Sequence, residues 1–425
     1  MNWKQKIPAG SLQFVLFIGV VILLLLLAFI TLSYTHSFFG NKTDLFISTI
    51  RQADAGLNYM LQDELIQQDS IGLPTNPDRP ISLNGIKEYW GVYEKYTVAS
   101  TSKKNRFVKS VLVGKKALGQ LPALYLQNKE RPLIIVGKAS ITGDAFLPQQ
   151  GIRTGNIAGN AFYGESTLGG NQRTSSAQLP KLDQNLRDHL ELVSQNQFRA
   201  PSEMILPFSH AMSYSNSFKQ PTQFIYGDRI DLVAVSLTGN LIIRASQKIT
   251  VRSRSQLQDV ILLAPEIEIK GKVKGTFQAI ASKHISVGKG CLLGYPSALV
   301  TVTKGQSATP STAEQRPAIL VDSKTDVLGM IVYLGPSQGQ QLLPQITVQD
   351  QVNLWGEIYC EQNLELKGNV FGSVTTQAFR AIEGGSIYQN HLFNGTINSA
   401  QLPQQYVGLL MSDASQSKGI SKWLY

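Results

Sequence analysis

The chain lacks the sequence patterns of the common catalytic and metal sites. Of its 425 residues only two are cysteines, too few for a disulfide framework. Its five histidines are scattered, and no H-x-x-x-H, H-E-x-x-H or C-x-x-C occurs, so a dedicated zinc site is not expected. There is also no G-x-S-x-G elbow and no phosphate-binding loop. We therefore expect a protein that is not an enzyme and that needs no cofactor.

Charge is missing from one long run near the N-terminus. Residues 14–32, from Phe14 to Leu32, read FVLFIGVVILLLLLAFITL. As an α-helix this run spans about 28 Å, at ~1.5 Å per residue, which is close to the thickness of a bilayer core. It ends without the small-x-small site of a cleaved signal peptide, so we expect an uncleaved transmembrane helix. Lys4 and Lys6 precede it, which predicts a cytoplasmic N-terminus and an extracytoplasmic remainder.

The residues before this run allow a second interpretation. The stretch KIPAGSLQF, ending at Phe14, resembles the leader of type IV pilins and pseudopilins, which have a short basic segment ending in glycine before a long apolar helix. The resemblance implies processing between Gly10 and Ser11. It departs at Val15, where those proteins usually have glutamate. A pseudopilin-like component of a secretion, competence or gliding apparatus is therefore the main alternative function.

After the apolar run the pattern predicts a helix and then a hairpin. Apolar residues recur at helical spacing, which predicts an amphipathic stalk over residues 36–72; they are Phe46, Ile50, Ala53, Leu57, Leu61 and Leu65. Gly72 and the prolines that follow predict a loop. Two strands are expected at residues 90–100 and 106–114, joined by residues 101–105, inside a small mixed region covering residues 73–130.

A repeat of 18 residues sets the expected fold. Ile249, Ile267 and Ile285 are spaced 18 apart, and so are Val251, Ile269 and Val287. The offset returns near the C-terminus, where Ile346 pairs with Leu364, Val348 with Leu366 and Val352 with Val370; ITGDAF at 141–146 also recurs, at an offset of 16, as IAGNAF at 157–162. Short strands at this period are typical of a parallel β-solenoid, in which each strand pairs with its equivalent about 4.8 Å away.

The domain organisation follows from this repeat. We expect a cytoplasmic tip and transmembrane helix at 1–35, a mainly β ectodomain formed by a parallel β-solenoid (β-helix) at 131–398, and a C-terminal cap at 399–425 that protects the open edge. Excursions from the coils are expected near 175–215 and 303–317. Cys291 and Cys360 would lie about 10 Å apart or more along the stack, too far for a disulfide, so both should be free and buried.

Basic residues gather on one part of the predicted solenoid. At the 18-residue period Arg252 stacks over Lys270 and Arg254 over Lys272, with Lys274 close by. With a net charge of +10, this predicts a face that docks a polyanion, either an acidic envelope glycan or an acidic partner protein. The alternative is an ordinary solvated face. Nucleic acid is not expected, because the face lacks interleaved aromatics and would lie outside the cytoplasm. The oligomeric state is left open.

Carboxylate pairs leave one enzymatic alternative. β-Helix enzymes that act on polysaccharides use clustered Asp, Lys and Arg on one face, and Asp228 and Asp231 could reach each other as paired carboxylates must. Aspartate also favours turns, and Tyr226-Gly-Asp-Arg has turn chemistry. A carbohydrate-active β-helix enzyme is therefore the lesser alternative.

Several segments resemble an uncharacterised group of single-span envelope proteins from bacteria of the Bacteroidota type. They include RPLIIVG at 131–137, GIRTG at 151–155, GTFQA at 275–279 and YPSA at 295–298. The predicted solenoid is also similar to bactofilins, which polymerise end to end but lack this anchor and these insertions. The Bacteroidota-type group has no established activity, so the resemblance supplies no site residues. From the anchor, the solenoid and the basic face together we expect a membrane-anchored, non-enzymatic structural or binding protein of the cell envelope, with inner-membrane lipid, acidic glycan and other envelope proteins as expected partners.

Overall fold

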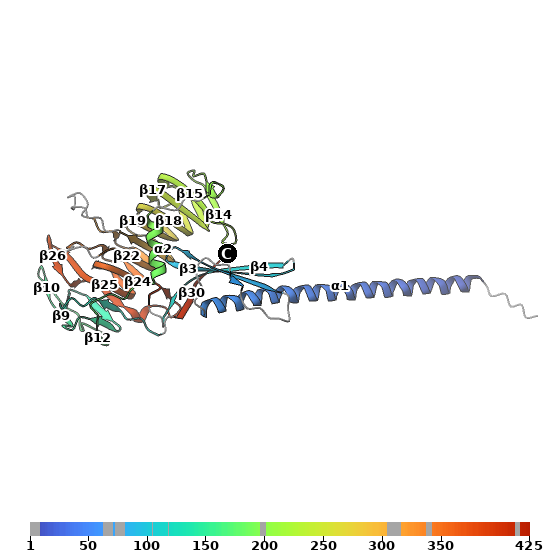
Figure 1. Ribbon diagram of the computed structural model, residues 1–425, viewed down its shortest axis with the longest axis horizontal. Helices are drawn as coiled ribbons and strands as arrows, with labels where there is room; N and C mark the ends of the chain where they lie inside the picture. The colour runs from blue at the N-terminus through green and yellow to red at the C-terminus, as the bar shows by residue number, and fades with distance from the viewer. Residues whose placement is uncertain are drawn as a thin grey trace, which may run out of the picture. The chain divides into compact units, whose positions relative to one another are not determined.

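The computed structural model describes residues 9–62, 71–72, 81–103, 105–117, 119–195, 201–303, 316–336, 342–412 and 417–425. Most of these residues lie in strands, so the protein is mainly β, with one long N-terminal helix (Figure 1). The chain forms two compact units. The first comprises Met1–Asn58, Ile71–Gly85 and Val98–Val108, and the second comprises Tyr59–Ser70, Ile86–Thr97 and Lys109–Tyr425.

Helix α1 (Ala9–Gln62) dominates the first unit. Its side chains are exposed through the apolar run, whereas Ala53 and Leu57 are buried. Phe46 packs edge-on against Phe107, with ring centroids 6.4 Å apart. The expected stalk at 36–72 therefore exists but ends early. Helix cannot extend through Ile71 and Gly72, because these residues form strand β1 (Ile71–Gly72) and pair antiparallel with Gly85 and Asn84.

One antiparallel sheet has the strand order β1–β2–β3–β4–β29, with β30 also paired to β4. Its other strands are β2 (Ser82–Trp90), β3 (Tyr93–Ser102), β4 (Asn105–Lys116), β29 (Val407–Gly408) and β30 (Ser417–Leu424). The hairpin expected at residues 90–114 corresponds to β3 and β4. Strand β2 precedes it and was not expected; it ends at Trp90 because the chain turns at Gly91 (φ +64°). The expected cap at 399–425 is wrong for its described last strand, because β30 continues the antiparallel sheet beside β4.

A large set of parallel strands forms most of the second unit, and we call it the parallel stack (Figure 1). Its main strands are β15 (Gln223–Leu232), β17 (Leu241–Val251), β18 (Gln256–Ile269), β19 (Lys274–Val287), β20 (Leu292–Val302), β22 (Asp326–Leu334), β24 (Asn353–Leu366) and β25 (Asn369–Glu383). Shorter members are β5 (Leu124–Leu126), β7 (Ser140–Thr142), β8 (Ala145–Leu147), β12 (Gln172–Thr174), β13 (Ile205–Leu206), β14 (Ser213–Asn216), β16 (Ser236–Gly239), β21 (Ile319–Val321), β23 (Ile346–Val348) and β28 (Thr396–Asn398).

Small elements decorate this stack. Strands β6 (Leu133–Val136), β9 (Ile152–Thr154) and β27 (His391–Phe393) form a parallel sheet of three. Strand β10 (Asn156–Ile157) pairs antiparallel with β11 (Asn160–Ala161), and β26 (Ser386–Gln389) pairs antiparallel with the end of β25. Short 3-10 helices occupy Ser202–Met204 and Ser399–Gln401.

The register of the stack matches the main columns of the repeat. Ile249 pairs with Ile267, and Ile267 with Ile285, in parallel. Val251, Ile269 and Val287 form the neighbouring column, and Ile346 pairs with Leu364. These side chains belong to one buried apolar cluster, so the alternation of apolar and charged residues in this part of the sequence reflects an inner and an outer face.

Two expected pairs are wrong, for the same physical reason. Val370 pairs with Leu354 rather than Val352, because the coil between β24 and β25 is two residues shorter than the repeat (Asn353↔Asn369). Ile157 does not stack on Ile141. It lies in the β10–β11 hairpin, while Ile141 pairs with Ile397. Insertions and deletions in the corners change the register without changing the apolar pattern of the strands.

Stacking order differs from chain order. Strand β25 pairs with β5, β5 with β8, and β8 with β12, so the strands at 124–174 continue the stack beyond β25. The chain must then return to the other end, where β13 and β14 pair with β15 and β16. Helix α2 (Gln184–Ser194) lies on this return path and packs across the middle strands, which accounts for the excursion expected near 175–215 (Figure 1). Residues 304–315 of the other expected excursion lie outside the described residues.

Two repeated polar or small positions hold successive coils together. Asp326, Asn353, Asn369 and Thr396 form a ladder of side-chain hydrogen bonds, with successive distances of 3.0, 2.9 and 2.7 Å. Gly329, Gly356 and Gly372 form a column with φ of +144°, +147° and +159°. A Cβ atom at Gly356 would lie 1.8 Å from the carbonyl oxygen of Gly329, so only glycine fits there. Both cysteines are free and buried, as expected.

Candidate functional site

The apolar half of α1 is the most exposed hydrophobic surface among the described residues. The whole predicted span, from Phe14 to Leu32, lies within the helix, and its most apolar window has a mean hydropathy of 3.3 with none of it buried. Helix α1 is therefore long and apolar enough to cross a membrane. Gly10 and Ser11, where processing would occur, lie in its first turn and are exposed.

The predicted polyanion-binding residues lie where the repeat places them. Arg252, Arg254, Lys270, Lys272 and Lys274 are all exposed, around the corner that joins one strand of the stack to the next. The backbone N–H of Lys270 donates to the carbonyl of Val251, and Gln256 pairs with Lys274. Arg252 therefore neighbours Lys270, and Arg254 neighbours Lys272, on successive coils.

Acidic side chains neutralise part of this set. Arg252 makes a bidentate contact with Asp231, with an Nη2–Oδ2 distance of 2.6 Å. Lys270 and Lys248 both contact Glu268, the latter at 2.7 Å. These contacts lower the pKa of Asp231 through the hydrogen bond from Arg252, and that of Glu268 through those from Lys248 and Lys270. The strand face therefore carries both signs of charge.

The corner itself has a different charge pattern. We define the basic corner as Arg254, Lys272, Lys289 and Lys324, which lie on successive coils and are all exposed. The N–H of Lys272 donates to the carbonyl of Lys289, and the N–H of Gly290 donates to that of Ser323. Within the described ranges these four side chains have no carboxylate within ion-pair distance. The basic corner is therefore a row of cations rather than a mixed surface.

Sequence reasoning missed Lys324 and one of the two neutralising acids, Asp231. The period carries Arg254 to Lys272 and then to Gly290, but the next coil is delayed by the segment at 303–317, which hides Lys324. The shared backbone conformation is a signal that only the structure shows. Lys272 and Lys324 have positive φ angles of +65° and +58°, and the next corner residue, Gln351, also has a positive φ, of +58°. Asp231 lies one coil earlier than the basic run and was not counted with it.

The carboxylates proposed for the enzymatic alternative have other partners. Asp228 accepts a hydrogen bond from Ser246 at 2.5 Å, and Asp231 is held by Arg252. A carboxyl group with a lowered pKa is a poor proton donor near neutral pH, which opposes a general-acid role for Asp231. In the part of the chain that the structure describes, no group of three or more His, Cys, Asp or Glu side chains could hold a metal ion.

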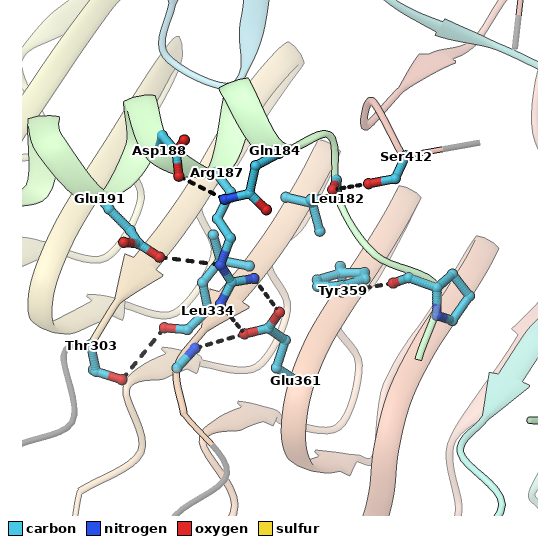
Figure 2. A network of polar contacts seen from close by, with 12 residues as sticks. Leu182, Gln184, Arg187, Asp188, Glu191, Thr303, Leu334, Tyr359, Glu361 and Ser412 are labelled. Carbon is cyan, nitrogen blue, oxygen red and sulfur yellow. Dashed lines mark hydrogen bonds and ion pairs between the residues drawn. The ribbon is translucent and has the colours of Figure 1, made fainter. Parts of the chain in front are cut away.

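Helix α2 is fixed to the stack by a polar network that surrounds Arg187 (Figure 2). The Arg187 guanidinium contacts both carboxylate oxygens of Glu361, at 2.5 and 3.0 Å, and Glu191 at 3.1 Å. Glu361 also accepts from the N–H of Gly335 at 3.0 Å. Leu186 and Leu190 are buried beneath the helix. Glu361 is thus a structural anchor, because its lone pairs are occupied.

A buried ionic network lies within the antiparallel sheet. Glu94 contacts Lys87 and Lys418, each at 2.8 Å, and accepts a hydrogen bond from Tyr96 at 2.8 Å. Burial by itself raises the pKa of Glu94, but the two ammonium groups outweigh it and lower the pKa. Because Lys418 belongs to β30, this network fastens the C-terminal strand to β2 and β3.

Comparison with known proteins gives little further information. No protein-family model matches the chain, and no curated protein matches it. A solved structure found as similar is the crystal structure of the competence-associated pilin ComZ from Thermus thermophilus. It is 11% identical, with a TM-score of 0.20, over 84% of this chain and 86% of that chain. This likeness is too distant to assign a fold or a function.

Proposed function

We propose that the protein is a membrane-anchored, non-enzymatic structural or binding protein of the bacterial cell envelope. In this proposal the parallel stack is a β-solenoid held outside the inner membrane by α1, and its basic residues dock a polyanionic glycan or an acidic partner protein. The observation that carries the proposal is the apolar half of α1, which is exposed over its full length. In water such a surface would drive aggregation, whereas lipid covers it without cost.

The rest of the molecule is consistent with a structural or binding role. The stack buries one continuous apolar cluster and is held by repeating backbone pairs, which suits a rigid ectodomain. The acids closest to a catalytic arrangement, Asp228 and Asp231, have other partners. Turnover of an acidic polysaccharide that Asp228→Ala abolishes would contradict this part of the proposal and favour the carbohydrate-active alternative.

Membrane anchoring can be tested by placing charge in the span. We expect Leu24→Lys/Leu25→Lys to move the protein from the membrane fraction to the soluble or degraded fraction, because each lysine at the centre of a helix costs about 3 kcal/mol on insertion. Ser37→Lys/Asn41→Lys is the matched control, since it adds the same charge outside the span and should leave the protein in the membrane. Release of the wild-type protein by alkaline carbonate would contradict the proposal.

Orientation needs a separate measurement. In cells with a permeabilised outer membrane, added protease should remove an epitope tag at the C-terminus and spare one at the N-terminus. The reverse pattern would place the stack in the cytoplasm. That result would be compatible with membrane anchoring by α1 but would contradict a location of the stack in the cell envelope.

A pseudopilin-like role is the second candidate. It is favoured by α1, which runs without a break from Gly10 through the apolar run to the buried Ala53 and Leu57. Processing separates the two candidates. Mass spectrometry of the mature protein would find Ser11, methylated, at the N-terminus of a pseudopilin, and Gly10→Leu would prevent this. An intact N-terminus in the wild-type protein would favour the plain anchor.

A further inference from the structure

The basic corner differs from the surfaces around it in having no neutralising acid. On the adjoining strands, Arg252 and Lys270 contact Asp231 and Glu268. Beyond Lys324 the next coil has Gln351 at the same corner position and the exposed Asp350 beside it. The nearest acid within the corner, Asp322, accepts a hydrogen bond from the N–H of Ser323 at 2.7 Å. The cations thus form a bounded row along the axis of the stack.

This row opposes the stability of the stack. The four cations lie on adjacent coils, which are about 4.8 Å apart. Lys289 is one residue away from the corner position that Lys272 and Lys324 share, where its own coil has Gly290. Like charges at that spacing repel, and alternating signs would be more favourable. The chain uses an uncharged residue at the equivalent corner of another coil, Gln351, with the same backbone conformation as Lys324. The geometry of the turn therefore does not require lysine.

We propose that the basic corner binds a linear acidic polysaccharide that lies along the stack, with its carboxylates beside successive coils. The inference rests on the proposed function, which places the stack outside the cytoplasm. A polyuronate carries one carboxylate per sugar, so its charges repeat at a short interval, and the basic corner offers one cation on each of four successive coils. Exposed aromatic side chains, on which bases or neutral sugars would stack, are absent from the described corner residues. The recognition is therefore by charge and spacing.

Binding is tested with the purified full chain in neutral detergent, with polygalacturonate as the probe and dextran as the uncharged comparison. We expect polygalacturonate to bind at low salt and to be released at high salt. Lys272→Gln should weaken binding about fivefold, and Arg254→Gln/Lys272→Gln/Lys324→Gln about a hundredfold, if each cation contributes similarly. Lys181→Gln/Lys219→Gln/Lys283→Gln removes the same charge from exposed lysines elsewhere and should weaken binding less than threefold.

The outcomes separate the inference from its alternatives. Equal losses in the two triple variants would show that only net charge matters and would overturn the corner as a site. Tighter binding to double-stranded DNA than to polygalacturonate would also overturn it. Because this assay uses isolated protein, it can fail while the anchor and orientation experiments succeed, and the reverse also holds.

A second measurement needs no ligand. If the row is retained for binding at the expense of stability, Lys272→Gln should raise the urea midpoint of the unliganded protein while it weakens binding. A lower midpoint with unchanged binding would mean that Lys272 has only a structural role and would contradict the proposal.

Discussion

The parallel stack and the antiparallel sheet both pair strands that are distant in the sequence, but different kinds of contact stabilise them. In the stack, Ile267 pairs with residues 18 positions before and after it, and the same contacts recur from coil to coil. In the sheet, Ser417 pairs with Lys116, and an ionic network around Glu94 helps to hold the strand. Repetition distributes the stability of the stack, whereas the sheet depends on residues that occur once.

The two regions can be followed separately, because Trp355 lies in the stack and Trp423 in the sheet. Variants that retain one tryptophan and have phenylalanine at the other positions would report the unfolding of each region by fluorescence in urea. The predictions that follow use this readout, in order of decreasing expected effect, with the pH-dependent prediction last.

The largest effect is expected at the glycine column of the stack. Gly356→Ala would place a Cβ 1.8 Å from the carbonyl oxygen of Gly329, at φ +147°. No side chain can move to relieve this clash, so the strands must separate. We expect the free energy of unfolding reported by Trp355 to fall by more than about 4 kcal/mol.

Gly384→Ala is the control for this effect. Gly384 also has a positive φ, +57°, but nothing lies within 4 Å of its Cβ position. It should cost about 1 kcal/mol, from backbone strain alone. Equal costs for the two substitutions would show that close packing of coils is not what requires glycine in the column.

Glu94→Gln should be the most damaging single change in the sheet. It removes the carboxylate that Lys87 and Lys418 share, and breaking a buried ion pair typically costs about 3 to 5 kcal/mol, or about 4 kcal/mol here. The loss should appear in Trp423 before Trp355. Glu88→Gln breaks a more exposed pair with Lys95 and should cost under about 1 kcal/mol. A smaller loss in Glu94→Gln than in Glu88→Gln would contradict the role of the network.

The same contrast explains what the sequence could predict. The columns at Ile249 and Val251 were readable because a side chain inside a stack needs an equivalent on the next coil. The stacking of β5 on β25 could not be predicted from the sequence, because no period links residues 124 and 374. Nor could the pairing of β30 with β4, which depends on Glu94 meeting Lys418. The basic residues were found by their period, but the acid of the preceding coil, Asp231, was visible only in space.

A moderate effect is expected at the ladder of amide side chains. Asn369→Ala removes a donor to Asn353 and an acceptor for Thr396, so we expect a loss of about 2 kcal/mol reported by Trp355. A double-mutant cycle with Asn353→Ala should show coupling of about 1 kcal/mol, because the two side chains share one hydrogen bond. Strict additivity would mean that the ladder does not act as a unit.

The last effect depends on pH and lies where sheet and stack meet. Glu357 of β24 accepts from the N–H of Leu409 at 3.4 Å, and burial raises the pKa of its carboxyl group to about 7. Tyr93, Tyr295 and Tyr406 interact electrostatically with it and supply no cation, while Lys115 offsets the raised pKa only in part. A raised pKa means that the folded state prefers the protonated form. The stabilisation is therefore complete below the ordinary pKa of 4.5 and is lost as the pH rises through 7.

Glu357→Gln isolates this contribution, because glutamine keeps the acceptor and cannot ionise. The variant should be more stable than the wild-type protein by about 3 kcal/mol near pH 8, with the difference falling below about 1 kcal/mol near pH 5. The Glu94 carboxyl group should behave in the opposite sense. Because its pKa is lowered in the folded state, its ionised form stabilises the sheet at neutral pH, and this stabilisation is lost in acid. If Glu357→Gln destabilises the protein equally at both pH values, the carboxyl group is held by charge rather than by burial, and the junction would then resemble the sheet more than the stack.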